Sequence, residues 1–156
     1  MNEHFQAIIR EATGAREVSQ IEVIQNLWSG YGKIVRCGLK GTDMKTVVVK
    51  HVRLPEQDHH PRGWNTDLSH ERKIKSYQVE TAWYDHWSNH CDDNCRIPSC
   101  LALESHDDEV LMVLEDLDDA GFPGRKNAVT LDELKAELAG QLSCYFYGRT
   151  AHQYLW

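Results

Sequence analysis

The segment Thr46–Pro55, with the sequence TVVVKHVRLP, most constrains the fold. Its three consecutive valines predict a buried β-strand. Because side chains alternate along a strand, Lys50 shares a face with Val48 and Val52. Burying an unpaired ammonium group on an apolar face is costly. We therefore expect an anionic partner for Lys50, which is either a carboxylate of the chain or a ligand.

Length and charge limit the classes of function. The chain has 156 residues, enough for one domain with a core, and a formal net charge of −7, which argues against a general nucleic-acid binder. Charge is unevenly distributed, because Tyr31–Arg53 contains six basic residues and one acid, whereas Glu104–Asp119 contains eight acids and no Lys or Arg. The first of these segments is suited to attract phosphate groups.

The N-terminal sequence and the cysteines bear on localisation. The first 14 residues lack the apolar core of a signal peptide, and no apolar run is long enough to span a membrane. Five cysteines, an odd number, fit a reducing compartment better than a disulfide framework. We therefore expect a cytoplasmic protein with neither a membrane nor a nucleic acid as its partner.

Periodicity and turn residues predict the order of the secondary structure. We expect a first helix, three strands, a loop, a long helix and two strands, at residues 2–13, 20–28, 33–39, 46–53, 54–66, 67–89, 100–105 and 109–117. Thr130 and Glu133 form a capping box that opens a final helix. The predicted fold class is α+β, with a five-stranded antiparallel sheet and one long packed helix.

Glu80 is the candidate partner for Lys50. It lies on the predicted long helix within a stripe of aromatic residues formed by Tyr77, Trp83, Tyr84 and Trp87. No cation stands three or four residues away on the same helix to pair with Glu80. Lys50 and Glu80 each lack a partner and each supplies what the other needs. The alternative is that Lys50 extends to the surface and Glu80 lies at the edge of the stripe.

The order of these features resembles a known fold. A turn with two glycines, SGYG at Ser29–Gly32, precedes the strand that carries Lys50; the helix with Glu80 follows, and a later strand runs into the acidic segment VLEDLDDAGFP. This order resembles the N-terminal lobe of the protein-kinase-like fold. The details are similar to the aminoglycoside phosphotransferase, choline kinase and ecdysteroid-kinase-like families. The resemblance covers roughly residues 20 to 140.

The resemblance implies ATP and Mg as cofactors, and a nucleotide and a small-molecule acceptor as partners. It assigns Lys50 to the α- and β-phosphates, Glu80 to the orientation of Lys50, SGYG to the loop over the phosphates, and Glu115–Leu117 to a hinge that binds adenine through backbone groups. Val35, Val48, Leu114 and Leu117 are candidate walls of the adenine slot; the alternative is that each is an ordinary core residue. The expected cofactor-binding residues are Ser29, Gly30, Tyr31, Gly32, Val48, Lys50, Glu80, Leu114, Glu115, Asp116 and Leu117.

The chain departs from the family after the predicted hinge. The family carries a catalytic Asp in a His-Gly-Asp loop and a metal-binding Asp further on. Downstream of Leu117, the one histidine is His152, and the acids are Asp118, Asp119, Asp132, Glu133 and Glu137. None of them stands in such a motif, so we assign no catalytic residue and no metal ligand in this chain, and expect the Mg ligands in a missing lobe.

These departures suggest three parts: a nucleotide-binding lobe at 1–117, a hinge and linker at 118–129, and the truncated or aberrant start of a C-terminal lobe at 130–156. The expected function is the ATP-binding lobe of a small-molecule phosphotransferase that transfers the γ-phosphate to a hydroxyl group, inactive as given because the catalytic lobe is missing. The alternative is a truncated, non-catalytic binding or regulatory module. An exposed lobe interface would favour self-association.

A third alternative is a zinc-structured interaction domain. His86, His90, Cys91, Cys95 and Cys100 follow the pattern H-x3-H-C-x3-C-x4-C. His86 and His90 are four residues apart and share a helix face, which would suit zinc. The pattern contains no C-x2-C pair, however, and acids interrupt it. Ordinary residues at a helix end and buried thiols are the simpler interpretation.

Overall fold

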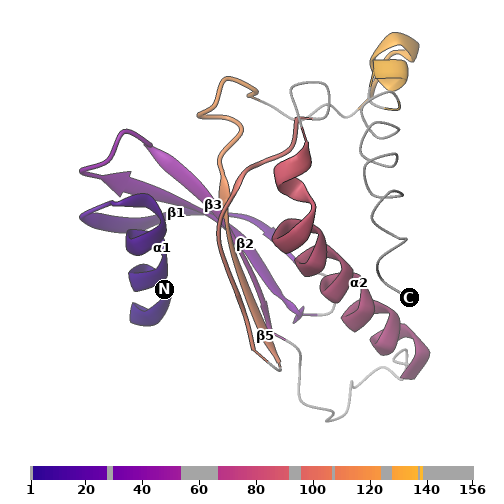
Figure 1. Ribbon diagram of the computed structural model, residues 1–156, viewed down its shortest axis with the longest axis horizontal. Coiled ribbons are helices and arrows are strands. Elements are labelled where there is room, and N and C mark those ends of the chain that lie inside the picture. Colours follow the sequence, from indigo (N-terminus) through magenta and orange to yellow (C-terminus); the bar gives the residue numbers. More distant parts are fainter. Residues whose placement is uncertain are drawn as a thin grey trace.

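The computed structural model describes residues 2–27, 30–53, 67–91, 96–106, 108–123, 128–136 and 138, with only the backbone described at 67–70. Its centre is a five-stranded sheet in the order β1-β2-β3-β5-β4 (Figure 1). All neighbouring strands are antiparallel. The strands are β1 (Glu17–Asn26), β2 (Gly32–Lys40), β3 (Thr46–Arg53), β4 (Cys100–Ser105) and β5 (Glu109–Glu115). The predicted α+β class and five-stranded antiparallel sheet are confirmed.

The first helix, α1 (Glu3–Thr13), covers one face of the sheet, as predicted. The side chain of Asn2 accepts a hydrogen bond from the backbone N–H of His4 and so caps the N-terminus of α1. Gly14 ends α1 with a left-handed φ of 69°. Ile8 and Ile9 are buried and anchor α1 to the sheet.

The main hydrophobic core lies between α1 and the sheet. Val47 and Val49 of β3 point into it, and the pairing of β3 with β2 and β5 adds residues from both neighbours. The buried members of this core are Ile8, Ile9, Ala15, Val35, Cys37, Leu39, Val47, Val49, Leu111 and Val113. Since side chains alternate along β3, Val48, Lys50 and Val52 lie on the opposite face.

The long helix, α2 (Asp67–His86), lies on that opposite face (Figure 1). A smaller buried cluster of Tyr77, Tyr31 and Val52 joins α2 to the sheet. The predicted end of α2 at residue 89 is wrong, because the chain tightens into the short helix η2 (Ser88–His90). There the hydroxyl of Ser88 donates to the carbonyl of Tyr84, 2.8 Å away, which competes with helix continuation. The predicted loop 54–66 lies outside the described residues.

The capping box at Thr130 is confirmed. The backbone N–H of Thr130 donates to Glu133 Oε2 at 2.8 Å, and the N–H of Glu133 donates to Thr130 Oγ1 at 3.3 Å. Residues 131–136 are helical, and Leu131, Leu134 and Leu138 are exposed. The predicted division near residue 118 and the predicted self-association both stay predictions. Among the described residues, no helix has the length and apolar character to cross a membrane.

Candidate functional site

Lys50 and Glu80 form the centre of the candidate site. β3 carries Lys50 to the face covered by α2, where its side chain is only 13 % exposed. Its ammonium nitrogen donates to both carboxylate oxygens of Glu80, each at 2.6 Å. The predicted pairing of Lys50 with Glu80 is therefore confirmed. Because both carboxylate oxygens accept from the ammonium group, its positive charge is held close to α2.

Tyr77 contacts the same ammonium group from one helical turn earlier. The nitrogen of Lys50 lies 5.5 Å from the centre of the Tyr77 ring, within the range of a cation–π interaction. The ring centres of Tyr77 and Tyr31 are 6.2 Å apart. Burial raises the pKa of the Tyr77 hydroxyl, and the nearby charge of Glu80 raises it further. Tyr77 therefore stays neutral beside the ion pair at physiological pH.

The glycine turn enters the site beside Tyr77. The φ of Gly32 is 136°, and a Cβ atom there would lie 2.0 Å from the carbonyl oxygen of His51, so only glycine fits. The backbone N–H of Arg53 donates to the carbonyl of Tyr31 at 2.7 Å, which ties the turn to the end of β3. The ring of Tyr31 is 2 % exposed and packs toward α2. Ser29, also predicted for this loop, lies outside the described residues.

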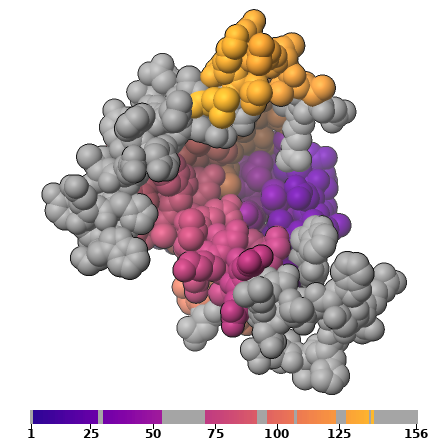
Figure 2. Space-filling model, turned by 90° about the vertical axis from the view of Figure 1, so that its right-hand side faces the viewer, coloured from indigo at the N-terminus to yellow at the C-terminus, as the bar shows by residue number. Residues whose placement is uncertain are grey.

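A cavity of about 500 Å³ opens beside the Lys50 face of the sheet. Five of the predicted cofactor-binding residues line it, namely Val48, Leu114, Glu115, Asp116 and Leu117. Val23 and Ile24 of β1, Pro98 and Phe122 supply further apolar wall. Seen from the α2 side, the surface is hollowed between the violet strands and the orange segment (Figure 2). The structure thus brings Val48 of β3 and the segment from Leu114 to Leu117 together around one cavity.

Val35 does not belong to this cavity. It pairs with Val49 across β2 and β3 and lies in the core under α1, where it is 3 % exposed. The prediction that Val35 forms a wall of the adenine slot is therefore wrong. Its strand was placed correctly, but which of its faces turns toward α2 depends on the pairing register with β3.

Arg36 links the sheet to the segment after β5, which sequence reasoning missed. Its Nε donates to Asp116 Oδ2 at 2.6 Å and its Nη2 to Asp116 Oδ1 at 3.2 Å. Glu22 and Asp118 also accept from the guanidinium group. Three carboxylates surround one cation on the cavity wall, which leaves that wall negatively charged.

The ion pairs set the charge states at the end of β5. Burial raises the pKa of Asp116, but hydrogen bonds from Arg36 and Thr46 outweigh burial, so the pKa lies below its usual value. A hydrogen bond from Arg96 lowers the pKa of Glu115, against the opposing effect of burial. Both carboxylates are therefore ionised at neutral pH. They present acceptors, and a ligand in this cavity is expected to present donors toward them.

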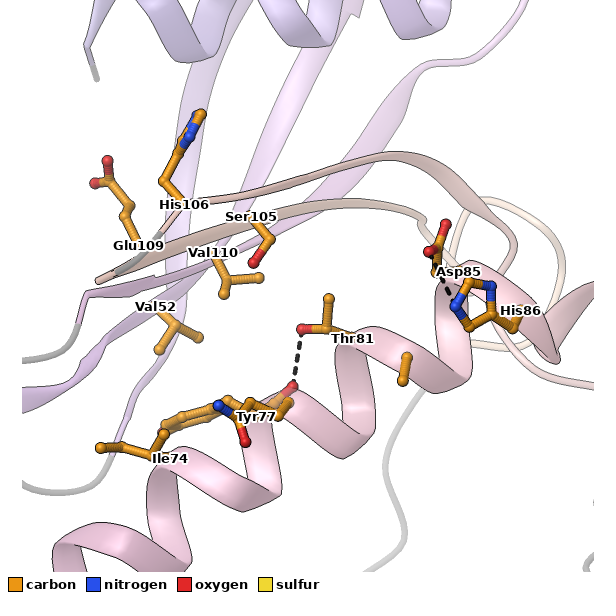
Figure 3. A pocket seen from close by; sticks show the side chains of 12 residues that line it. Val52, Ile74, Tyr77, Thr81, Asp85, His86, Ser105, His106, Glu109 and Val110 are labelled. Atoms are coloured by element: carbon orange, nitrogen blue, oxygen red, sulfur yellow. Dashed lines mark hydrogen bonds and ion pairs between the residues drawn. The ribbon is translucent and has the colours of Figure 1, made fainter. Parts of the chain in front are cut away.

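A second cavity, of about 670 Å³, lies between α2 and the turn that joins β4 to β5. Figure 3 shows Val52 and Val110 on the sheet side and Ile74, Tyr77 and Thr81 on the helix side. The hydroxyl of Thr81 donates to the carbonyl of Tyr77 at 2.8 Å, within α2. The same Tyr77 and Val52 therefore border both this cavity and the Lys50 site.

The predicted zinc pattern does not assemble in the part of the chain that the structure describes. No group of three His, Cys, Asp or Glu side chains there is placed to hold a metal ion. His86 lies 3.4 Å from Asp85, and the ring of His90 lies 6.0 Å from that of Trp87. Cys95 lies outside the described residues.

Two comparisons with known proteins complete the description of the site. No family among known protein families matches the chain. A search of curated proteins likewise finds no match.

Proposed function

We propose that this chain binds ATP as the nucleotide-binding lobe of a small-molecule phosphotransferase with the protein-kinase-like fold. The acceptor is a small molecule with a hydroxyl group that receives the γ-phosphate. The observation that carries the proposal is the Lys50–Glu80 pair, in which a strand lysine is held at 2.6 Å by both oxygens of a helix carboxylate. The cavity of about 500 Å³ on the same face of the sheet is large enough for a nucleobase.

The arrangement of the elements supports the proposal. The glycine turn opens β2, Lys50 lies on the central strand β3, Glu80 comes from the helix that follows β3, and β5 leads into the cavity wall. A phosphotransferase lobe of this kind needs a fixed positive charge close to a base-binding slot. Here Val48 lines the cavity two residues before Lys50 on the same strand face.

The residues present fit a bound nucleotide. Lys50 would neutralise charge on the phosphates, and the Gly30–Gly32 turn would offer backbone N–H groups to them. The apolar side chains of Val48 and Leu114 would contact the base, while backbone groups near Leu117 would hydrogen-bond its edge. When bound, ATP supplies the phosphoryl group. What these residues do is bind and orient ATP, and they move no proton.

The described residues do not fit a magnesium site. No cluster of three potential metal-binding side chains occurs within them, and the acids near the cavity are bound by Arg36 and Arg96. No step is therefore assigned to a metal on this chain, and we expect nucleotide binding rather than turnover. A non-catalytic binding module remains the second candidate for the same reason.

Calorimetric titration with ATP and with adenosine tests the proposal on three proteins: the natural chain, Lys50→Met and Lys45→Met. Lys45 is a matched control, because it is a lysine of the same sheet region with an 85 % exposed side chain. We expect Lys50→Met to weaken ATP binding at least tenfold and to leave adenosine binding unchanged, since adenosine has no phosphates. Lys45→Met should bind both ligands like the natural chain.

The proposal is wrong if the natural chain binds neither ligand, or if Lys50→Met and the natural chain bind ATP equally. A second measurement can exclude the non-catalytic candidate. Radiolabelled ATP is incubated with the chain and a panel of hydroxyl compounds that includes choline and aminoglycosides. Label transferred to an acceptor would establish a phosphotransferase and overturn the non-catalytic module, whereas ATP binding without transfer is the result that both candidates predict for this chain.

A further inference from the structure

Tyr77 occupies a position that the Lys50–Glu80 pair alone does not explain. It precedes Glu80 by three residues on α2, so the two side chains leave the helix on the same side. Both reach Lys50: the Glu80 oxygens lie at 2.6 Å and the Tyr77 ring centre at 5.5 Å from the ammonium nitrogen. One helix therefore presents a carboxylate and an aromatic face to a single cation.

The Tyr77 ring is fixed from its other sides. It is 8 % exposed and packs in one cluster with Tyr31, which is 2 % exposed, and Val52, which is fully buried. Tyr31 in turn belongs to the glycine turn, whose backbone is hydrogen-bonded to Arg53 at 2.7 Å. In Figure 3 the Tyr77 side chain extends from α2 toward Val52 along the edge of the second cavity. The ring thus bridges the glycine turn and the lysine.

We propose that Tyr77 is a positioning residue that sets the location of the Lys50 ammonium group and couples it to the glycine turn through Tyr31. The lysine side chain has a flexible four-carbon stem, so a single carboxylate partner leaves the ammonium group free to change its position around that carboxylate. An aromatic face on a second side removes that freedom. Because the same ring packs on Tyr31, the turn and the ammonium group keep a fixed separation, as binding one chain of phosphates requires.

The aromatic ring of Tyr77, and not its hydroxyl group, makes the contacts that position Lys50. The contact is between the ammonium nitrogen and the ring centre, and the packing with Tyr31 is between the two rings. Phenylalanine preserves both contacts and leucine preserves neither, although both are apolar. The comparison of Tyr77→Phe with Tyr77→Leu therefore isolates the aromatic face.

The first experiment measures Lys50 directly and uses no nucleotide. Each protein is treated with an amine-acetylating ester, and the rate at Lys50 is followed by peptide mass spectrometry relative to Lys40, which is 77 % exposed. We expect Tyr77→Phe to stay within twofold of the natural chain and Tyr77→Leu to react at least fivefold faster at Lys50. Tyr31→Leu, which removes the second ring, should also raise the acetylation rate at Lys50, but by a smaller factor.

A second series excludes a mere packing effect and does not depend on the folding of Tyr77→Leu. Phenylalanines with one, two and three ring fluorines are placed at position 77, which weakens the negative face of the ring with little change of shape. We expect the acetylation rate at Lys50 to rise stepwise with the number of fluorines. A flat series, or equal rates for Tyr77→Phe and Tyr77→Leu, overturns the proposal.

The inference rests on the proposed function only for its purpose, which is to hold Lys50 ready for phosphates. A titration with ATP is run on the same variants, and Tyr77→Leu should lose affinity for ATP several-fold while keeping its affinity for adenosine. If the natural chain binds no ATP, the proposed function fails, and the acetylation rates still decide whether Tyr77 positions Lys50. If ATP binds equally to Tyr77→Leu and Tyr77→Phe, the coupling to the phosphate site is refuted.

Discussion

Exchanging Glu80 for glutamine should destabilise the fold more than exchanging Lys50 for methionine, although each change breaks the same ion pair. The reason is the difference in burial, since the Lys50 side chain is 13 % exposed and that of Glu80 is 31 % exposed. Glu80→Gln leaves the more buried partner as an uncompensated cation. Lys50→Met leaves the carboxylate, which reaches water more easily, and the methionine keeps an apolar stem between Val48 and Val52.

The magnitudes follow from the burial of the pair. Exposed ion pairs contribute about 0.2–1 kcal/mol, whereas removing one partner of a buried pair costs about 3–5 kcal/mol. The Lys50–Glu80 pair lies between these limits. We expect a loss of about 2 kcal/mol in unfolding free energy for Glu80→Gln and about 1 kcal/mol or less for Lys50→Met, because only the first strands a largely buried charge.

Urea unfolding at pH 7, followed by tryptophan fluorescence, measures both single variants and the double variant. The double variant should be more stable than the sum of the single losses predicts, because the second change removes the stranded charge. High salt should change this coupling little, since a partly buried pair is weakly screened. Additive losses, or a larger loss for Lys50→Met than for Glu80→Gln, would refute the reasoning from burial.

Three further changes test other parts of the site. Gly32→Ala should cost more than about 2 kcal/mol in unfolding free energy because its Cβ meets the His51 carbonyl, whereas Gly30→Ala, with open space around it, should cost about 1 kcal/mol; thermal unfolding compares them. The pKa of Asp116 is lowered from 3.8, so its ionised form stabilises the fold above that pH and this contribution is lost as the pH falls through the folded pKa. The stability gap between the natural chain and Asp116→Asn should therefore be constant near pH 7 and shrink in acid titration, and a gap that widens toward low pH would contradict the ion pair. Burial raises the pKa of the Cys37 thiol to about 11, so Cys37 should resist a thiol-alkylating reagent at pH 8 until urea unfolds the chain; rapid labelling at Cys37 itself in the folded protein, located by peptide mass spectrometry, would contradict its burial.

The secondary structure could be predicted because its signals are local, and the central contact could be predicted because each of its two charges lacks a partner nearby in the sequence. The valines around Lys50 define a strand by composition, and the spacing of Ile8 and Ile9 defines a helix face. The pairing of Lys50 with Glu80 followed from two charges that each lacked a nearby partner. Such a mismatch is visible in sequence even when the partners are far apart along the chain.

The remainder of the site depends on strand register, which local patterns do not contain. Arg36 faces Val48 across β2 and β3, and Leu114 faces Val48 across β3 and β5. This register brings Arg36 within reach of Asp116, two residues after Leu114. The misplaced wall residue Val35 has the same origin, since a shift of one residue exchanges the faces of a strand. The burial of Tyr31 was also hidden, because its partner Tyr77 lies on a helix that the glycine turn meets only in the folded chain.

The strand order has a consequence for how the chain folds. β1, β2 and β3 are joined by short connections and pair in sequence order, so they can assemble early as a meander. Arg53 of β3 faces Glu109 of β5, so this strand pairing closes a loop that contains the whole of α2. The entropy lost on closing that loop opposes the pairing, and we expect this step to precede the docking of α2. Lys50 therefore lies on an already formed strand before Glu80 reaches it, and we expect the ion pair to form after the rate-limiting step of folding. Changes at Glu80 should then act mainly on the unfolding rate and leave the refolding rate almost unaltered.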